Sequence, residues 1–241
     1  MTDIDILWEE NSLQHTQKYI DPEELTKLNA NDINILSQNV RSLKRNGIKL
    51  SAMLNKASHV DLIFLQEVWS PKIPINIKVF KLELLKRTSK RGGGLGVYVK
   101  ENTEYKIVEE KVTTNWEVQI LVLKAIQNEI MFVNTYIPLK KMGKVAMKEL
   151  TELCSKYQNH ENIVYIGDFN QDLLNNKEAI GVNYFAFDNG CTVLSSLPTR
   201  VTKTKKSCLD LVLIKSIFSY ECNVILTDIS DHFTPILSLK T

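Results

Sequence analysis

Short apolar runs separated by polar turns dominate the chain, and this pattern predicts many β-strands. From residue 92 to residue 136 the pattern is entirely of this kind and predicts a meander of antiparallel strands. Its apolar runs fall at residues 95–99, 105–112, 117–125 and 129–136. Further strands are predicted at residues 33–37, 61–65, 163–166, 192–194, 209–214, 223–226 and 236–239.

Two stretches show the spacing of an amphipathic helix. The apolar positions are Leu50, Met53, Leu54 and Ala57 in the first stretch and Ala146, Leu150, Leu153, Cys154 and Tyr157 in the second. Near the N-terminus, Asp21 and Pro22 form a helix-start pair and Glu24 completes a capping-box-like pattern, so a short helix is expected through Leu28. Many strands with a few interspersed helices predict an α/β fold, a four-layer α/β sandwich in which two packed mixed sheets are flanked by helices.

The domain organisation follows from length and composition. A chain of 241 residues with 44% hydrophobic residues can bury a large core. No Pro/Gly/Ser-rich linker, low-complexity tract or internal repeat divides the sequence. We therefore expect one large domain over residues 31–241, preceded by an N-terminal extension, residues 1–30, that contains the short helix.

Cellular location and redox state are constrained by what the sequence lacks. The apolar runs are too short to cross a bilayer, and the acidic N-terminus has no basic segment leading into an apolar stretch. We expect an intracellular protein without a membrane span, monomeric as an isolated domain. The cysteines lack the paired short spacing of a zinc site, which favours reduced, structural thiols. They are Cys154, Cys191, Cys208 and Cys222.

The net charge of +2 does not by itself indicate a nucleic-acid-binding protein, because the arrangement of charge matters more than its sum. Basic residues gather in three segments that are predicted to be loops or element ends. These are Lys86, Arg87, Lys90 and Arg91, then Lys140, Lys141 and Lys144, then Arg200, Lys203, Lys205 and Lys206. Three basic loops could straddle a phosphate backbone. Any one of them taken alone is better explained as a solvated surface.

Several predicted strands end at a polar residue that can bind a metal ion or move a proton. Strand ends can present such side chains to a cleft, whereas strand interiors are committed to packing. The repetition therefore predicts a site where these strand ends meet. The residues at strand ends are Asn39, Glu67, Tyr136, Asp168 and Asn170, and Asp231 and His232 precede the last predicted strand.

Most of these residues also have an ordinary structural explanation. Asp168 and Asn170 can form an Asx turn after their strand, and the Asp-His pair at residues 231–232 can be a simple hydrogen-bonded pair. Glu67 is harder to explain in this way, because a carboxylate after a buried strand needs a partner, and Mg²⁺ is a natural one. Asp210 lies inside an apolar run, where it could form a buried salt bridge or orient a histidine ring.

Seven short motifs follow one another along the chain. They are Gln38-Asn39, Gln66-Glu67, Gly93-Gly94-Leu95-Gly96-Val97, Thr135-Tyr136-Ile137-Pro138, Gly167-Asp168-Phe169-Asn170, Ser207-Cys208-Leu209-Asp210 and Ser230-Asp231-His232. Each motif is weakly specific, but the ordered set resembles the endonuclease/exonuclease/phosphatase superfamily from Ile33 to Leu239. Within it, the segments at residues 39–43 and 197–200 look like the apurinic-type endonuclease domain of non-long-terminal-repeat retrotransposons, which precedes a reverse transcriptase.

The resemblance implies a Mg²⁺ site, with Mn²⁺ as a substitute. Glu67, helped by Asn39, would hold the ion against the scissile phosphate, where it offsets developing charge. Asp231 would lie near the ion or its waters. The metal-binding residues implied by the resemblance are therefore Glu67, Asn39 and Asp231.

The resemblance also implies roles in proton transfer and phosphate binding. Asp168 would orient and deprotonate the attacking water, with Asn170 placing the phosphate. Asp210 would pair with His232 and keep the imidazole protonated, so that it donates to a non-bridging phosphate oxygen. Tyr136 would donate its hydroxyl to the same phosphate or stabilise the leaving oxygen.

The implied substrate is double-stranded DNA, nicked by hydrolysis to leave a 3′-hydroxyl that primes reverse transcription at the target. This activity implies action in the nucleus and fusion to a reverse transcriptase in the full-length protein. Target choice is expected to depend more on DNA shape than on a side-chain code. The expected DNA contacts are Arg41, Thr199, Arg200, Lys203, Lys205, Lys206 and Ser207.

Two positions depart from the branch of the superfamily that repairs apurinic sites. Arg41 stands where those relatives carry a second metal-ligating aspartate, and Leu139 stands where they place an asparagine. The first change weakens the expected metal site, and the second removes a polar contact. Both changes point away from repair of abasic sites.

Two other functions are compatible with the motifs. A phosphatase or sphingomyelinase-like phosphoesterase of the same fold would use the same metal and His/Asp set, but the basic loops and the missing secretion signal count against it. A catalytically inactive DNA-binding module is suggested by Arg41. The retention of Glu67, Asp168, Asp210 and His232 together counts against that alternative.

Overall fold

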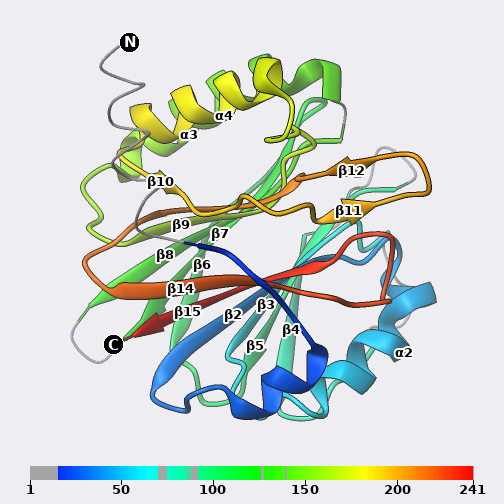
Figure 1. The fold of residues 1–241 in the computed structure, drawn as a ribbon. Coiled ribbons are helices and arrows are strands. Elements are labelled where there is room, and N and C mark those ends of the chain that lie inside the picture. Colours follow the sequence, from blue (N-terminus) through cyan, green and yellow to red (C-terminus); the bar gives the residue numbers. More distant parts are fainter. Residues whose placement is uncertain are drawn as a thin grey trace.

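Two β-sheets pack face to face at the centre of the molecule (Figure 1). The computed structural model describes residues 16–69, 75–85, 87, 92–125, 128–138 and 140–240. Of the positions discussed above, Lys86, Lys90, Arg91, Leu139 and residues 1–15 lie outside the described residues.

The first sheet has seven strands and is mixed. Its strands are β1 (Tyr19–Ile20), β2 (Asp32–Asn39), β3 (Leu62–Gln66), β4 (Phe80–Leu85), β5 (Leu95–Lys100), β14 (Ser219–Ile225) and β15 (Thr234–Lys240). They lie in the order β1-β14-β15-β2-β3-β5-β4. The pairs β1–β14 and β2–β3 are parallel, and the other pairs are antiparallel.

The second sheet has six strands and is also mixed. Its strands are β6 (Tyr105–Val112), β7 (Glu117–Lys124), β8 (Glu129–Tyr136), β9 (Ile163–Asp168), β10 (Thr192–Val193) and β13 (Asp210–Lys215). They lie in the order β10-β13-β9-β8-β7-β6, with β8 and β9 parallel. A separate hairpin of β11 (Arg200–Val201) and β12 (Lys206–Ser207) projects from one side (Figure 1).

Helices cover the outer faces of both sheets, which confirms the predicted four-layer α/β sandwich (Figure 1). Helix α2 (Leu43–Leu54) lies on the first sheet, and α3 (Gly143–Cys154) and α4 (Asn176–Asp188) lie on the second. The short 3₁₀ helices are η1 (Pro22–Lys27), η2 (Lys140–Met142) and η3 (Ser155–Tyr157). Within the described ranges, no helix is long and apolar enough to cross a membrane.

The predicted meander is wrong at its first strand. Strands β6, β7 and β8 pair in sequence order, but β5 pairs with β3 and β4 in the first sheet. The chain therefore passes from one sheet to the other between Lys100 and Tyr105. Residues 95–99 are buried on both faces of β5, so the local pattern contains no information about the sheet to which the strand belongs.

Helix α4 is not predicted from the sequence, because it has apolar residues on both faces. Val182 and Phe185 are buried, whereas Ile180, Tyr184 and Phe187 are exposed. This distribution removes the one-sided period by which an amphipathic helix is recognised. Strand β4 is likewise found only in the structure.

The N-terminal helix is present as the 3₁₀ helix η1, with Asp21 at the N-cap. The side chain of Asp21 makes no capping hydrogen bond, so the expected capping box is not formed. Before η1, strand β1 extends the edge of the first sheet, and the Gln17 side-chain oxygen accepts the backbone N–H groups of Ser196 and Leu197. Residues 16–27 thus pack on the sandwich, and the division of the chain at residue 30 stays a prediction.

Gly167 in β9 offers a test of the close packing between neighbouring strands. Its φ is +139°, and a Cβ built there would lie 2.1 Å from the backbone oxygen of Thr135 on β8. Gly167→Ala is expected to lower the free energy of unfolding by about 2–4 kcal/mol, because backbone strain and overpacking add. Urea unfolding followed by circular dichroism measures the change.

Gly181→Ala is the matched control for this substitution. A Cβ at Gly181 on α4 meets nothing within 4 Å, so alanine there should be neutral or stabilising. Equal destabilisation by the two substitutions would contradict the packing described for Gly167.

Candidate active site

Four polar side chains form a row across the second sheet, one on each of four neighbouring strands. Glu117 on β7 pairs in register with Tyr136 on β8, which pairs with Asp168 on β9, and Asp168 pairs with Asp210 on β13. All four side chains are buried. Burial, together with the charge of Glu67, raises the pKa of Tyr136, so its hydroxyl remains a neutral donor.

The first sheet contributes Asn39 at the end of β2 and Glu67 directly after β3. Asn39 Nδ2 donates to Oε1 of Glu67 at 2.9 Å and to Oδ2 of Asp168 at 2.8 Å. Its Oδ1 accepts the backbone N–H of Arg41 at 3.1 Å, which fixes the orientation of the amide. One buried amide therefore joins carboxylates that belong to different sheets.

Asp168 lies at the centre of this cluster. Burial and the nearby carboxylate of Asp210 raise its pKa to about 7, against the opposing effects of His232 and the Asn39 amide. Asn170 donates its backbone N–H to Oδ1 of Asp168 at 2.9 Å. A carboxyl group that titrates near neutrality is suited to accept a proton from water.

His232 and Asp210 form a buried pair, with Nδ1 and Oδ2 at 2.8 Å. Burial disfavours the charged imidazole, but the attraction of Asp210 and their hydrogen bond outweigh it and raise the pKa of His232 to about 9. The imidazole is therefore protonated at neutral pH, with Nε2 as a further donor. Thr199 stabilises the start of β13, because its hydroxyl oxygen accepts the backbone N–H groups of Leu209 and Asp210.

Two groups of residues are candidates for a metal ion. Ligand atoms of Asp168, Asp210 and His232 lie within 4.8 Å of one another. A protonated imidazole has no free lone pair for a metal ion, which argues against this triad. Glu67 fits better, because its oxygens accept hydrogen bonds from the Asn39 amide and the Trp69 indole, and no salt bridge to it forms within the described residues. A half-buried carboxylate that forms no salt bridge with a described residue and is joined through the Asn39 amide to a second carboxylate suits Mg²⁺.

Asp231 accepts hydrogen bonds from two guanidinium groups. Arg41 Nη1 lies 2.7 and 2.8 Å from its two oxygens, and Arg200 Nε lies 2.9 Å from Oδ2. Burial disfavours the carboxylate, but Arg41, His232 and Arg200 lower the pKa of Asp231 to about 2, so it is ionised. The proximity of Asp231 to a metal ion stays a prediction. In the structure, Arg41 and Arg200 both pair with the carboxylate of Asp231, so the three side chains carry a net charge of +1.

Backbone strain is concentrated in the loops of the site. Five of the seven described non-glycine residues with a positive φ lie there: Arg41 (+42°), Ser42 (+88°), Glu67 (+54°), Trp69 (+56°) and Asn170 (+49°). Such conformations cost about 1–3 kcal/mol each and persist where the surrounding structure over-determines them. Here the Ser42 backbone N–H donates to the Glu67 carbonyl at 2.7 Å, so two strained loops hold each other.

Glu117 and Trp69 belong to the site but are not identified from the sequence. Glu117 is fully buried and accepts the backbone N–H of Gly94 at 2.6 Å. Its other oxygen lies 2.5 Å from Nε of Arg87, an ion pair without hydrogen-bond alignment. Burial raises the pKa of Glu117, and Arg87 opposes the rise. The sequence contains one sign of Glu117: it is an acidic residue at the start of a buried strand, and it lies opposite Tyr136 if β7 and β8 form a hairpin.

The expected DNA contacts divide into buried and exposed residues. Thr199 and Ser207 are 1% and 6% exposed, and the contact of their side chains with DNA stays a prediction. The Thr199 hydroxyl oxygen accepts the backbone N–H groups of Leu209 and Asp210, and Ser207 is buried at the end of β12. Lys203, Lys205 and Lys206 are exposed on the hairpin, where Lys205 pairs with Asp172.

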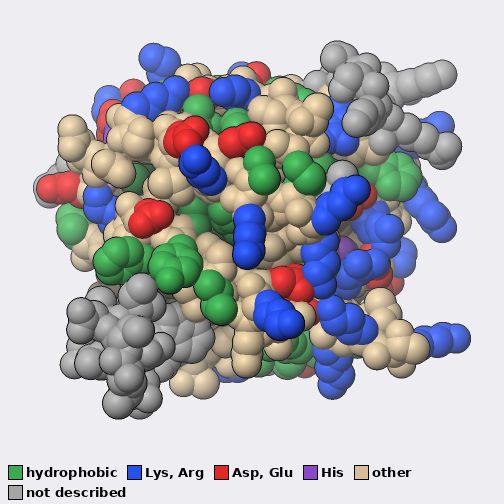
Figure 2. Space-filling model, turned by 90° about the horizontal axis from the view of Figure 1, so that it is seen from above, with side chains coloured by type: hydrophobic (Ala, Val, Ile, Leu, Met, Phe, Trp, Pro, Cys, Tyr) green, Lys and Arg blue, Asp and Glu red, His purple; other side chains and the backbone are tan. Residues whose placement is uncertain are grey.

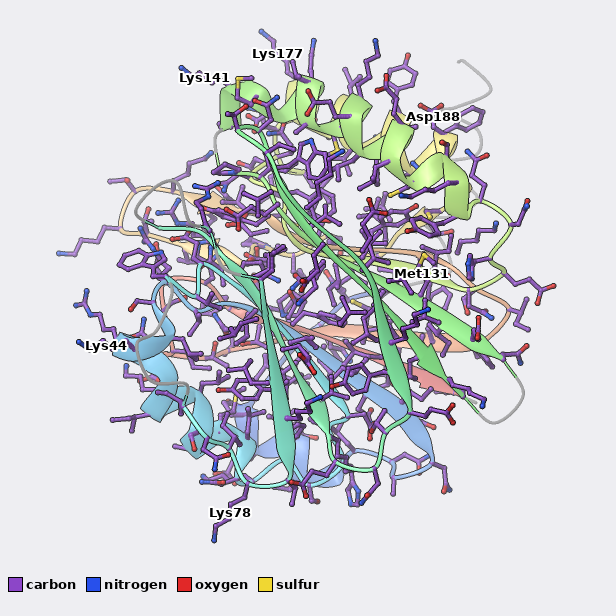
Figure 3. The ribbon with its side chains drawn as sticks, turned by 180° about the vertical axis from the view of Figure 1, so that it is seen from behind. Lys44, Lys78, Met131, Lys141, Lys177 and Asp188 are labelled. Atoms are coloured by element: carbon purple, nitrogen blue, oxygen red, sulfur yellow. The ribbon has the colours of Figure 1, made fainter. Side chains whose placement is uncertain are left out.

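Basic side chains gather on one side of the molecule. Figure 2 shows Lys and Arg concentrated on the side from which the β11–β12 hairpin projects in Figure 1. Figure 3 places Lys44 of α2 and Lys141 of η2 on that same side. The hairpin is tied to the site, since Arg200 forms a β-bridge with His232 and the Thr199 carbonyl accepts the backbone N–H of Phe233. Three distant segments thus provide a basic surface beside the site.

The sequence profile of the endonuclease/exonuclease/phosphatase family matches residues 34–232, a span that contains every residue of the site. None of the curated proteins compared with the sequence matches it.

Solved structures share the fold at low sequence identity. The endonuclease domain of TRAS1, a telomere-specific non-LTR retrotransposon, has a TM-score of 0.69 and 14% identity, covering 87% of this chain and 98% of that chain. Truncated TDP2 of Caenorhabditis elegans has a TM-score of 0.64 and 14% identity, with 86% and 97% covered. The human Nocturnin catalytic domain has a TM-score of 0.62 and 13% identity, with 88% and 94% covered.

The protonation of His232 can be tested by NMR titration of its imidazole. The wild type should titrate near pH 9, and Asp210→Asn should titrate at lower pH, because the attracting carboxylate is gone. The folded-state pKa exceeds the ordinary value of 6.5, so the pair stabilises the fold fully below that pH. This contribution is lost as the pH rises through about 9, which urea unfolding as a function of pH would measure.

Asp228→Asn is the control for this titration. It removes an exposed carboxylate that pairs with Lys49 and should leave the titration of His232 unchanged. If Asp210→Asn also left it unchanged, the Asp210–His232 pair would not be the cause of the raised pKa.

Proposed function

The chain belongs to the endonuclease/exonuclease/phosphatase family, and from this premise we propose that it is a divalent-metal-dependent DNA endonuclease. It nicks double-stranded DNA by phosphodiester hydrolysis and leaves a 3′-hydroxyl that primes reverse transcription at the target. The observation that carries the proposal is the convergence of Glu67, Asp168, Asp210 and His232 from four strand ends beside a basic surface. Shared hydrogen bonds and strand register link the four residues.

Glu67 would hold the metal ion, Mg²⁺ or its substitute Mn²⁺, while Asn39 keeps the carboxylate in place. The bound ion supplies positive charge against the charge that develops on the phosphate. Asn39 presents its N–H to both carboxylates and its oxygen to the Arg41 backbone. This orientation supports a positioning role for Asn39.

Asp168 is suited to take the proton of the attacking water, because its raised pKa lies near neutrality. The water oxygen forms a bond to phosphorus, the bond from phosphorus to the 3′ oxygen breaks, and the leaving oxygen takes up a proton. Asn170 donates its backbone N–H to Asp168, and we expect its side chain to contact the phosphate. Tyr136, a neutral hydroxyl in the same row, is suited to stabilise the leaving oxygen.

The cationic groups of the site are suited to bind phosphate oxygens. His232 bonds to Asp210 through Nδ1, which leaves Nε2 to donate to a non-bridging oxygen. Arg41 and Arg200 share the carboxylate of Asp231, and their excess positive charge supports contact with the DNA backbone.

The retrotransposon setting is also part of the proposal. It is supported by the similarity to the TRAS1 endonuclease domain and by the motifs at residues 39–43 and 197–200. It includes fusion to a reverse transcriptase and action in the nucleus. TDP2 and Nocturnin share the fold, so the choice of DNA as substrate depends on the basic surface and not on the architecture.

Plasmid nicking tests the proposed activity. The purified protein should convert supercoiled plasmid to the nicked circle with Mg²⁺ and lose this activity with EDTA. Asp168→Asn and His232→Ala should each lower the rate by a factor of about 10²–10⁴, because each removes a proton-transfer or donor group. Gel electrophoresis measures the rate, and end analysis of the product identifies the 3′-hydroxyl.

Lys106→Ala serves as a control for these variants, because Lys106 is exposed at the end of β6 farthest from the site. It should nick at the wild-type rate. Full activity in Asp168→Asn would discard the assignment of that residue. Release of inorganic phosphate from inositol phosphates without plasmid nicking would favour a phosphatase instead.

The hairpin lysines provide a separate test of DNA binding. Substitution of both Lys203 and Lys206 by alanine should weaken binding and reduce the slope of log affinity against log salt concentration by about two, because two phosphate contacts are lost. Fluorescence anisotropy over a series of salt concentrations measures the slope. Lys106→Ala should leave the slope unchanged, and an unchanged slope in the hairpin variant would remove the hairpin from the interface.

A further inference from the structure

We propose that Trp69 positions Glu67 and also contacts the substrate, through stacking of its exposed indole on a nucleobase beside the scissile phosphate. This inference rests on the proposed endonuclease function and adds a residue to which no role in the site was assigned from the sequence. It is based on the hydrogen bond from Trp69 to Glu67, the exposure of the ring and the way in which the loop is held.

The indole of Trp69 sets the orientation of the Glu67 carboxylate. Trp69 Nε1 donates to Oε2 of Glu67 at 3.1 Å, while Asn39 Nδ2 donates to Oε1 at 2.9 Å. Each oxygen therefore has its own donor, and two donors on two oxygens fix the plane of a carboxylate. Groups that orient a metal ligand in this way influence the affinity and activity of metal sites.

The ring of Trp69 remains available to a ligand. Trp69 is 38% exposed, whereas Trp116, the other described tryptophan, is 2% exposed. Among the described residues, the Trp69 Nε1 atom, at 3.7 Å, is the one neighbour within 4 Å of a Cβ built on Gly92. A large aromatic group that is exposed and held at a strand end suits contact with a partner.

The loop that carries Trp69 is held on both sides. The backbone N–H of Trp69 donates to the Gly93 carbonyl at 2.9 Å, and that of Val68 donates to the Gly94 carbonyl at 3.1 Å. The backbone N–H of Gly94 in turn donates to the buried carboxylate of Glu117 at 2.6 Å. The hydrogen bonds to Gly93 and Gly94 stabilise Trp69 at a φ of +56°. A rigid aromatic side chain loses little conformational freedom when a base stacks on it.

A nucleobase matches this surface better than the other substrates of the fold. Every base has a flat π face. In double-stranded DNA this face becomes accessible when the base leaves the stack, and an unstacked base commonly stacks on aromatic side chains without strict sequence preference. An inositol phosphate has no aromatic face to place against the indole. The position of Trp69 next to Glu67 places the stacked base close to the bond that would be cut.

Two substitutions separate the hydrogen bond from the stacking. Trp69→Phe keeps an aromatic face but removes the N–H, and Trp69→Leu removes both. We expect Trp69→Phe to bind DNA in EDTA as the wild type does, to bind Mg²⁺ more weakly in calorimetry, and to nick about tenfold more slowly at saturating DNA. We expect Trp69→Leu to show the same defects and, in addition, to bind DNA about tenfold more weakly.

A base-deletion experiment locates the stacking. In a duplex that carries a mapped nick site, single nucleotides around the site are replaced one at a time by abasic residues, and binding is measured by anisotropy in EDTA. At one position the replacement should weaken wild-type binding and leave Trp69→Leu unaffected, since the two changes remove the same contact. Thermal unfolding of each variant controls for loss of structure.

The outcomes distinguish this inference from the proposed function. A wild-type protein that neither binds nor nicks DNA would overturn both. If the wild type binds and nicks DNA while Trp69→Leu matches it in DNA affinity, Mg²⁺ affinity and rate, only the role of Trp69 falls. A defect in Mg²⁺ binding and rate, with no abasic position that couples to Trp69, would leave Trp69 as a positioning residue and remove the stacking.

Discussion

One amide group, that of Asn39, joins the two sheets at the point where the chemistry is concentrated. Its Nδ2 donates to Glu67, which follows the first sheet, and to Asp168, which ends a strand of the second. A second polar link lies behind it, where Gln66 Nε2 donates to Asn134 Oδ1 at 2.8 Å. Polar links inside an otherwise apolar interface are satisfied in one relative position of the sheets, so they fix the geometry that the site requires.

The charges of the site are balanced in a way that suits a phosphodiester. Asp210 keeps His232 protonated, and burial among carboxylates keeps the pKa of Asp168 near neutrality. Glu67 has no cationic partner within the described residues, so a divalent ion has a place there. The guanidinium groups of Arg41 and Arg200 both donate to the carboxylate of Asp231. This arrangement supports the proposed hydrolysis, in which cations would face the phosphate and Asp168 would accept a proton from the attacking water.

The backbone strain of the site and the fixed orientation of its side chains have a common cause. The polar side chains follow directly from strands whose interiors are fully packed, so the chain must turn sharply where the site begins. Positive φ angles at Glu67, Trp69 and Asn170 are the result. The backbone hydrogen bonds from Ser42 to Glu67 and from residues 68–69 to residues 93–94 stabilise the turn at Glu67 and Trp69, and the Asn170 N–H donates to Asp168 in its own turn. The strained turns cost local stability, but they orient the polar groups of the site before any ligand binds.

The fold class, the motif order and the polar residues that border strands, including Asp168 and His232, follow from the sequence, because a polar residue next to an apolar run is a local pattern. Which of these groups share a partner depends on the tertiary structure. It placed Arg41 on Asp231, buried Thr199 behind Asp210, and brought Glu117 into the row. Such relations arise from the register between strands that are distant along the chain, and register is set by the packing of both sheets together. No local pattern contains that information.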